Sequence, residues 1–184
     1  MKHFYKIAIG LSLVLTSCGD SFLDVDPETE IFDNNFYRTV ADAEMALIGC
    51  YDGYQRTSSN GNQAFYVTSE VLSDNTFGGT GHTDGRGYQL LDRFDKSESP
   101  SWTDYYAGIF RCNTLLSKLN GTTFEEGTTT RARIEGETKF LRAIMYFDLV
   151  RLFERVPLLT APTSANVPQA AAVDTYKLIV EDLK

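Results

Sequence analysis

The sequence has few of the side chains from which enzymes build catalytic and metal sites. It contains two histidines and three cysteines, and none of the usual signatures of serine hydrolases, zinc proteases or phosphate-binding loops. His3 lies in an N-terminal export signal, so a catalytic triad or zinc site would have to use His82 with Asp74 or Asp84. We therefore predict a chain that is not an enzyme and needs no metal or cofactor. A glycosidase-type pair of carboxylates is the alternative, because acidic residues are numerous.

Basic side chains are also in the minority. The chain has 17 Lys and Arg against 25 Asp and Glu, which gives a formal net charge of -8. Such a balance disfavours binding to nucleic acid and to anionic lipid headgroups. A membrane attachment would therefore need a source other than a basic patch.

The N-terminus carries an apolar run, residues 7–15, that follows a basic start and is too short to span a bilayer. The run ends in Leu15-Thr16-Ser17-Cys18, which resembles a lipobox, the bacterial signal for cysteine lipidation. The resemblance implies that residues 1–17 are removed as a lipoprotein signal peptide and that Cys18 carries acyl chains in a membrane leaflet. The alternative is an ordinary cleaved signal that happens to contain the cysteine. Residues 18–38 are predicted to be a tether between the lipid and a helical domain.

Four later segments repeat apolar residues at the spacing of one face of an α-helix. No segment is a convincing strand followed by a turn and a second strand. The sequence therefore predicts an all-α domain of antiparallel helix pairs over residues 39–184. In chain order, the expected inner faces consist of Ala43, Leu47, Cys50, Tyr51 and Tyr54; Trp102, Tyr106, Ile109, Asn113 and Leu116; Ile134, Thr138, Leu141, Met145, Leu149 and Leu152; and Tyr176, Ile179, Val180 and Leu183.

Local signals indicate where these helices begin. Thr39 and Asp42 have the spacing of a capping box, so the first helix is expected to start near Thr39. The third helix is expected over about residues 130–153. Asp174 is predicted to cap the last helix, with Val173 and Leu178 packed together as a hydrophobic staple.

Four residues within the helices carry further expectations. Asn113 interrupts an apolar stripe, so its amide is expected to be buried and hydrogen-bonded to a neighbouring helix or loop backbone. Gly136 lowers helix propensity, which suggests close approach of a partner helix. Cys50 and Cys112 fall on or beside apolar faces. Their positions favour two buried thiols, with a disulfide as the alternative.

Between residues 56 and 101 the helical spacing is lost, apart from a possible short helix over residues 63–72. The glycines of residues 78–87 indicate a loop, and a connection this long is usually functional or disordered. Interleaved aromatic residues argue against disorder. Aromatic rings beside polar groups suit the flat faces and hydroxyl edges of sugars, although any one ring could instead anchor the loop. The predicted ligand-binding residues are Asp74, Asn75, Phe77, His82, Asp84, Arg86 and Tyr88, with Phe94 nearby.

Residues 137–158 closely resemble the hallmark of the SusD/RagB family, the surface glycan-binding lipoproteins of Bacteroidetes nutrient-uptake systems. The stretch matches E-x-x-F-L-R-A, then a helix rich in Tyr and Phe, then a Phe-Gly-x-Val-Pro-Leu close, with Glu154 in place of the usual glycine. Shorter matches follow the family's order. They are Phe22-Leu23-Asp24 with Pro27; Trp102, Tyr106, Ile109 and Asn113; and Tyr176, Ile179, Asp182 and Leu183.

The resemblance implies a body of tetratricopeptide-like helix pairs with long irregular loops, in which Trp102 is structural. Family members are longer than this chain, so residues 1–184 are expected to be the N-terminal portion only, with the helical domain of residues 39–184 truncated at its C-terminus. The implied function is to capture an oligosaccharide at the outer membrane and deliver it to a TonB-dependent, SusC-like transporter, with Cys18 as the anchor and no nucleic-acid partner. The alternatives are a peptide-binding or protein-binding RagB-like uptake component and a helical interaction module.

Overall fold

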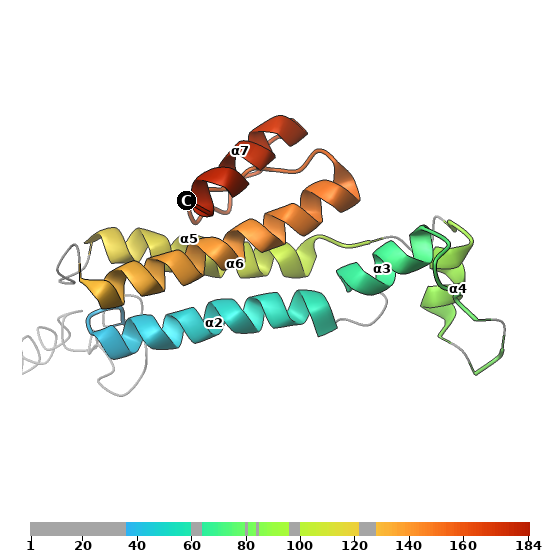
Figure 1. Cartoon of the computed structure of the whole chain (residues 1–184), viewed down its shortest axis with the longest axis horizontal. Helices are drawn as coiled ribbons and strands as arrows, with labels where there is room; N and C mark the ends of the chain where they lie inside the picture. The colour runs from blue at the N-terminus through green and yellow to red at the C-terminus, as the bar shows by residue number, and fades with distance from the viewer. Residues whose placement is uncertain (1–35, 60–63, 80, 84, 96–99, 122–127) are drawn as a thin grey trace, which may run out of the picture. The chain divides into compact units, whose positions relative to one another are not determined.

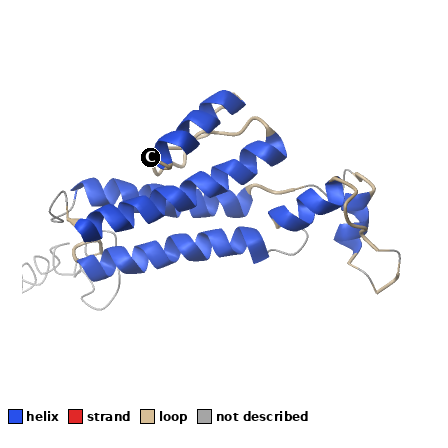
Figure 2. Ribbon diagram, in the orientation of Figure 1, coloured by secondary structure: helices blue, strands red, loops and turns tan. Residues whose placement is uncertain are grey.

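The computed structural model describes residues 36–59, 64–79, 81–83, 85–95, 100–121 and 128–184. Within these ranges the regular elements are helices, joined by loops and one isolated bridge between Pro157 and Gln169 (Figure 1, Figure 2). The all-α prediction is confirmed. The helices are α2 (Val40–Ser59), α3 (Phe65–Leu72), α4 (Arg86–Asp92), α5 (Thr103–Gly121), α6 (Thr129–Phe153) and α7 (Ala172–Asp182).

The predicted signal peptide, Cys18 and most of the tether lie outside the described residues. The helices that are described include none with the length and apolar character needed to cross a membrane.

Helix α2 begins with the predicted capping box. The Thr39 hydroxyl accepts a hydrogen bond from the Asp42 backbone N–H at 3.2 Å, and the Asp42 carboxylate accepts one from the Thr39 N–H at 2.8 Å. These reciprocal bonds satisfy two donors that a helix start otherwise leaves unpaired. The same hydrogen bonds to Thr39 lower the pKa of the Asp42 carboxyl.

The start of α7 differs from the prediction. Ala171 is the capping residue, because its carbonyl accepts hydrogen bonds from the N–H groups of Asp174 and Thr175 at 3.0 and 3.3 Å. Asp174 therefore lies in the first turn, where its charge favours the positive end of the helix dipole. Val173 is 58% exposed and forms no staple.

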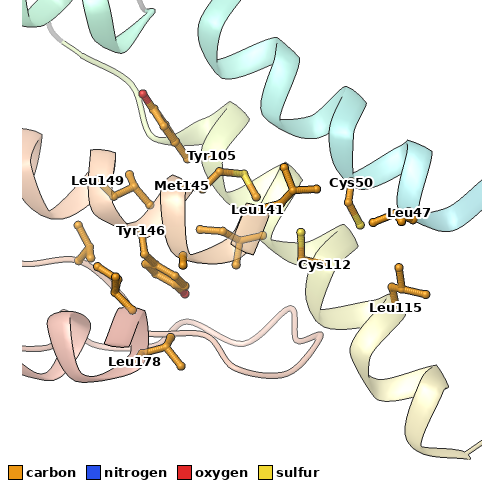
Figure 3. Close-up of a cluster of buried hydrophobic side chains, with 14 of the residues drawn as sticks. Leu47, Cys50, Tyr105, Cys112, Leu115, Leu141, Met145, Tyr146, Leu149 and Leu178 are labelled. Carbon is orange, nitrogen blue, oxygen red and sulfur yellow. The ribbon is translucent and has the colours of Figure 1, made fainter. Parts of the chain in front are cut away.

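The core forms where α2, α5 and α6 pack on one another and α7 packs on α6. Figure 3 shows side chains of all four helices in one cluster. Cys50 and Cys112 are both buried free thiols, as predicted. The largest fully buried side chains are Tyr105, Tyr146, Ile109, Leu115, Leu119, Ile134, Leu141, Met145, Leu149 and Val156.

Most residues expected at the centres of the inner faces are buried, but several of those expected at the edges are exposed. Tyr51 is 45% exposed and donates a hydrogen bond to Glu137 at 2.9 Å. Trp102 is 37% exposed and precedes α5. On α7 the buried face is rotated from the expected one, so Tyr176, Val180 and Leu183 are exposed. The side chains that α7 buries are Thr175, Leu178, Ile179 and Asp182.

The close approach of two helices that was predicted at Gly136 occurs instead at Gly53 and Gly108. A Cβ atom added to Gly53 would lie 2.8 Å from the Cα atom of Gly108, and one added to Gly108 would lie 2.5 Å from the sulfur of Met145. A Cβ atom at Gly136 would meet nothing within 4 Å. Helices α2 and α5 are therefore in backbone contact at this point, and the prediction for Gly136 is wrong because that residue faces open space.

A buried polar network connects three of the helices. Arg142 forms a two-pronged ion pair with Asp182, with nitrogen–oxygen distances of 2.7 and 2.6 Å, and donates to the Asn113 carbonyl oxygen at 2.7 Å. Asn113 in turn donates to the Leu159 carbonyl at 2.9 Å, which confirms the expectation of a buried amide bonded to a loop backbone. The Tyr146 hydroxyl also accepts from the Leu159 N–H at 2.8 Å. This network thus joins residues from three separate sequence motifs, namely Asn113, Arg142 and Asp182.

Helix α6 ends in a tight turn at the family's glycine position. Glu154 has φ 61° and ψ −59°, and the Arg155 N–H donates to the Phe153 carbonyl at 2.6 Å. This is the γ-turn conformation that L-residues with side chains rarely adopt. The glutamate therefore occupies a backbone conformation that favours glycine.

Candidate functional site

The candidate site is carried by α3 and α4, which pack against each other (Figure 1). Thr68 and Val71 of α3 and Leu91 of α4 are buried. The predicted short helix over residues 63–72 is confirmed as α3. Helix α4 was not predicted, because its first residues lie in a stretch whose glycines indicate a loop.

The loop between α3 and α4 is held against α4 by small residues and one amide. A Cβ atom at Gly78 would lie 2.9 Å from the Cβ atom of Asp92, so only glycine fits against the helix there. The Gln89 side-chain amide donates to the Gly81 carbonyl at 3.0 Å. Gly79 has φ 86°, a conformation that glycine adopts without strain. Contacts at Gly78 and Gly81 therefore hold the loop against α4.

Two phenylalanines project from this unit into solvent. Phe77 is 70% exposed and Phe94 is 64% exposed. Phe94 follows the end of α4 with φ 52°, a conformation that costs free energy for a bulky residue. Neither burial nor backbone preference accounts for a phenylalanine at that position. The positive φ belongs to the turn that ends α4, in which the Phe94 N–H donates to the Leu91 carbonyl at 3.0 Å and the Asp95 N–H to the Leu90 carbonyl at 2.9 Å. The exposed ring is therefore the feature that points to binding.

Polar residues flank Phe77 at the end of α3. Asp74 has φ 58° and is exposed, and the neighbouring Asn75 is exposed while its N–H donates to the Glu70 carbonyl at 3.1 Å. This turn brings a carboxylate and an amide next to an exposed ring in sequence. Such a set can hydrogen-bond sugar hydroxyls beside a stacking surface.

The remaining predicted residues are spread along the loop and the start of α4. His82 is exposed, and Arg86 is the first residue of α4 rather than a loop residue. Tyr88 lies within α4, and its ring covers Gly85, where an added Cβ atom would lie 2.7 Å from the ring. Tyr88 thus anchors the loop. Asp84 lies outside the described residues.

No group of three metal-binding side chains occurs in the part of the chain that the structure describes. Two ionisable groups of the helical core have raised pKa values. Burial raises the pKa of Asp148, whose carboxylate pairs with Arg151 at 2.5 Å, and the hydrogen bond to Cys50 together with burial raises the pKa of Cys112.

The comparison with protein families assigns the fold. A family model described as "Starch-binding associating with outer membrane" matches residues 21–184. The chain belongs to the SusD-like family. By that description, the family is linked with starch binding and the outer membrane.

Individual relatives agree in sequence and in structure. SusD-like protein P38 of Formosa agariphila is 29% identical over 197 residues, which cover 100% of this chain and 37% of the relative. A solved laminarin-binding SusD-like protein is 32% identical, with a TM-score of 0.64 over 79% of this chain and 33% of that one. A SusD superfamily protein of Bacteroides vulgatus has the same fold at 22% identity, with a TM-score of 0.61 over 80% of this chain and 34% of that one. The chain spans about a third of the length of these relatives.

Proposed function

We propose that the chain forms part of a cell-surface lipoprotein that captures an oligosaccharide and delivers it to a TonB-dependent, SusC-like outer-membrane transporter. The observation that carries the proposal is the pair of exposed phenylalanines, Phe77 and Phe94, on the α3–α4 unit of a SusD-like chain. Binding of this kind requires stacking and hydrogen bonds, and no covalent step.

In the proposed site, Phe77 and Phe94 offer apolar surfaces on which the faces of sugar rings stack. Asp74 and Asn75 bond the hydroxyls beside Phe77. His82 and Arg86 extend the polar edge along the loop, and Tyr88 contributes from its base. Asp84 is proposed from the sequence alone. The anchored loop supports this assignment, because a preformed surface loses little conformational entropy on binding.

The proposed attachment is through Cys18 and its acyl chains. Residues 18–38 would then connect the lipid to the helical domain and let that domain move over a transporter pore. Acyl chains supply the membrane affinity that an acidic chain cannot obtain from charge. Expression in a Bacteroidetes host with radiolabelled palmitate tests this step. Label in the wild type and none in Cys18→Ser supports the anchor, and equal label in both contradicts it.

Calorimetric titration with starch-derived and laminarin-derived oligosaccharides tests the ligand class. Saturable heat without release of shorter sugars supports a binder, and hydrolysis of any glycan overturns the proposal. Binding to peptides but to no glycan would favour the peptide-uptake alternative. Phe77→Ala should weaken glycan binding about tenfold, the equivalent of a lost stacking contact of about 1.4 kcal/mol. Phe140→Ala removes a 52% exposed phenylalanine from α6 and is the matched control.

A further inference from the structure

Trp102 is the only tryptophan of the chain and is held in a fixed position although it is 37% exposed. Its ring meets that of Tyr106 edge-on, with centroids 6.0 Å apart, and lies tilted against Phe153 at 5.5 Å. An exposed ring that its neighbours fix in this way is a preformed flat apolar surface.

Two hollows open beside this ring. One has a volume of about 260 Å³, and its lining includes Trp102, Phe110 and Asn166. The other has a volume of about 420 Å³, and its lining includes Trp102, Phe153 and Gln169. Volumes of this order are typical of sites for small ligands. Trp102 is therefore shared by two adjacent spaces.

The wall opposite the ring is the segment after α6, which is fixed to the helices. The Tyr106 hydroxyl donates to the Pro157 carbonyl at 2.6 Å, and the Ala170 N–H donates to the Val156 carbonyl at 2.9 Å. Leu159 is held by the buried network around Asn113. Because these bonds fix the segment, little ordering is required when a ligand binds.

The chemistry of the lining favours an uncharged ligand. Among the described residues that line the two hollows, none is charged. Aromatic and aliphatic surfaces are combined with the amides of Asn166 and Gln169 and the hydroxyls of Ser101 and Thr163. This combination fits a neutral, hydroxyl-rich ring better than a charged peptide or a nucleotide.

We propose that Trp102 is the platform of a second sugar-contact site, separate from the α3–α4 loop. One pyranose ring stacks on the indole, and Asn166 and Gln169 bond its hydroxyls from the two sides. The ligand class rests on the proposed function, whereas the position and the residues do not. Two contact sites on one chain would favour long glycans over short ones, because the second contact forms at a high effective concentration.

Intrinsic fluorescence tests the site directly, because the emission of the chain's single tryptophan arises at Trp102. The chain is titrated with the starch-derived and laminarin-derived oligosaccharides while emission, acrylamide quenching and heat are recorded. A stacked sugar should shift the emission to shorter wavelength, reduce quenching and saturate at the same concentration as the heat. Peptides of similar length should leave the emission unchanged, and an emission response to peptides but to no sugar overturns the proposal.

Substitutions separate this proposal from the loop site. Trp102→Phe keeps a ring against Phe153, and Asn166→Ala leaves the aromatic cluster intact. Each substitution should weaken binding of long oligosaccharides, by up to about tenfold, while Phe140→Ala leaves binding unchanged.

The combined results separate the two sites. If Phe77→Ala reduces the binding heat and Trp102 emission does not respond to sugar, the second site is wrong and the proposed function stands. If emission responds and Phe77→Ala has no effect, the second site stands and the loop site is wrong. No heat and no emission change with any sugar overturns both.

Discussion

The helical core and the α3–α4 unit use polar and aromatic residues in opposite ways. In the core, Arg142 and Asp182 are buried as a fully bonded pair whose side chains are 7% and 4% exposed. In the α3–α4 unit, Phe77 and Phe94 lie in solvent although they are apolar. A buried charge costs free energy unless it is paired, whereas an exposed ring is a surface on which a ligand can pack. The core contains its partners, and the α3–α4 unit is expected to obtain its partner as a ligand.

The largest effect should come from breaking the core pair. Arg142→Met leaves Asp182 as an unpaired buried charge, so we expect the free energy of unfolding to fall by about 3–5 kcal/mol. Urea unfolding followed by circular dichroism measures this change. The matched control is Lys177→Met, which breaks an exposed pair with Asp174 and should cost less than about 1 kcal/mol. Equal losses in the two variants would contradict the role given to the buried network.

The next effect concerns the close approach of α2 and α5. Gly53→Ala places a methyl group against the Gly108 backbone, which cannot give way cheaply, so we expect a loss of about 1–3 kcal/mol. Gly136→Ala is the control, because it adds the same methyl group to an open helix face and should stabilise by up to about 1 kcal/mol. Thermal unfolding of both variants gives the comparison. Destabilisation by Gly136→Ala would mean that the wrong glycine has been assigned to the contact.

Alkaline pH should weaken the core through its buried tyrosines. Burial raises the pKa of Tyr146 to about 12 and also raises that of Tyr105 and Tyr106. Unfolded tyrosines lose their protons near pH 10, before the folded ones. The stability that the buried, protonated tyrosines contribute is therefore fully present below about pH 10. It is lost as the pH rises through the pKa values of the folded tyrosines. The pKa of the Cys112 thiol is also raised in the folded state, so its contribution to stability begins to be lost as the pH rises above about 8.5.

Urea unfolding between pH 7 and 11 in reducing buffer tests this dependence. Tyr105→Phe is an informative variant, because its hydroxyl has no hydrogen-bond partner among the described residues. The variant should be at least as stable as the wild type at pH 7, because it removes a buried unpaired hydroxyl, and should lose less stability at pH 11. A flat profile for the wild type above pH 10 would contradict the assignment of these phenols to the core.

The smallest effect is expected at the end of α6. Glu154→Gly places glycine in a positive-φ turn that favours it, and we expect stabilisation of about 0.5–1 kcal/mol. Glu154→Ala keeps the Cβ atom and is the control, since it should give little or no gain. Thermal unfolding resolves the two, and equal gains would show that the charge of Glu154 matters rather than its backbone conformation.

Local signals in the sequence predicted local features of the fold. The capping box of Thr39 and Asp42 spans four residues, and the spacing of α6 spans 25 residues, so both could be recognised without knowledge of the tertiary structure. Asn113 was also predicted to be bonded and buried, because an amide in an apolar stripe requires a partner. The motifs shared with SusD-like proteins led to the correct family.

Features that depend on distant residues were missed. The Arg142–Asp182 pair joins residues 40 positions apart, and neither segment carries a sequence signal that identifies the other as its partner. Helix propensity identified Gly136 as unusual but could not show that Gly53 and Gly108 are the glycines in contact. Trp102 was assigned to the core because it matches a core position of a helix motif, and the sequence could not show that its side chain is 37% exposed.

For the candidate site, the sequence indicated the region and the structure separated its residues by role. Phe77 is exposed, whereas Tyr88 packs over Gly85 and supports the loop. Glycine content masked α4, so Arg86 was expected in a loop although it begins a helix. The exposure of Phe94 in the turn that ends α4 could not be predicted from its neighbours in sequence.

The most direct test of the contrast between core and α3–α4 unit is a paired measurement on Phe94→Asn. Asparagine tolerates positive φ better than phenylalanine, so unfolding in urea should show unchanged or slightly higher stability. Calorimetry on the same samples should show oligosaccharide binding weakened about tenfold. Stability that holds while binding falls is the result that we predict. Lower stability with unchanged binding would contradict the account, because Phe94 would then be a structural residue.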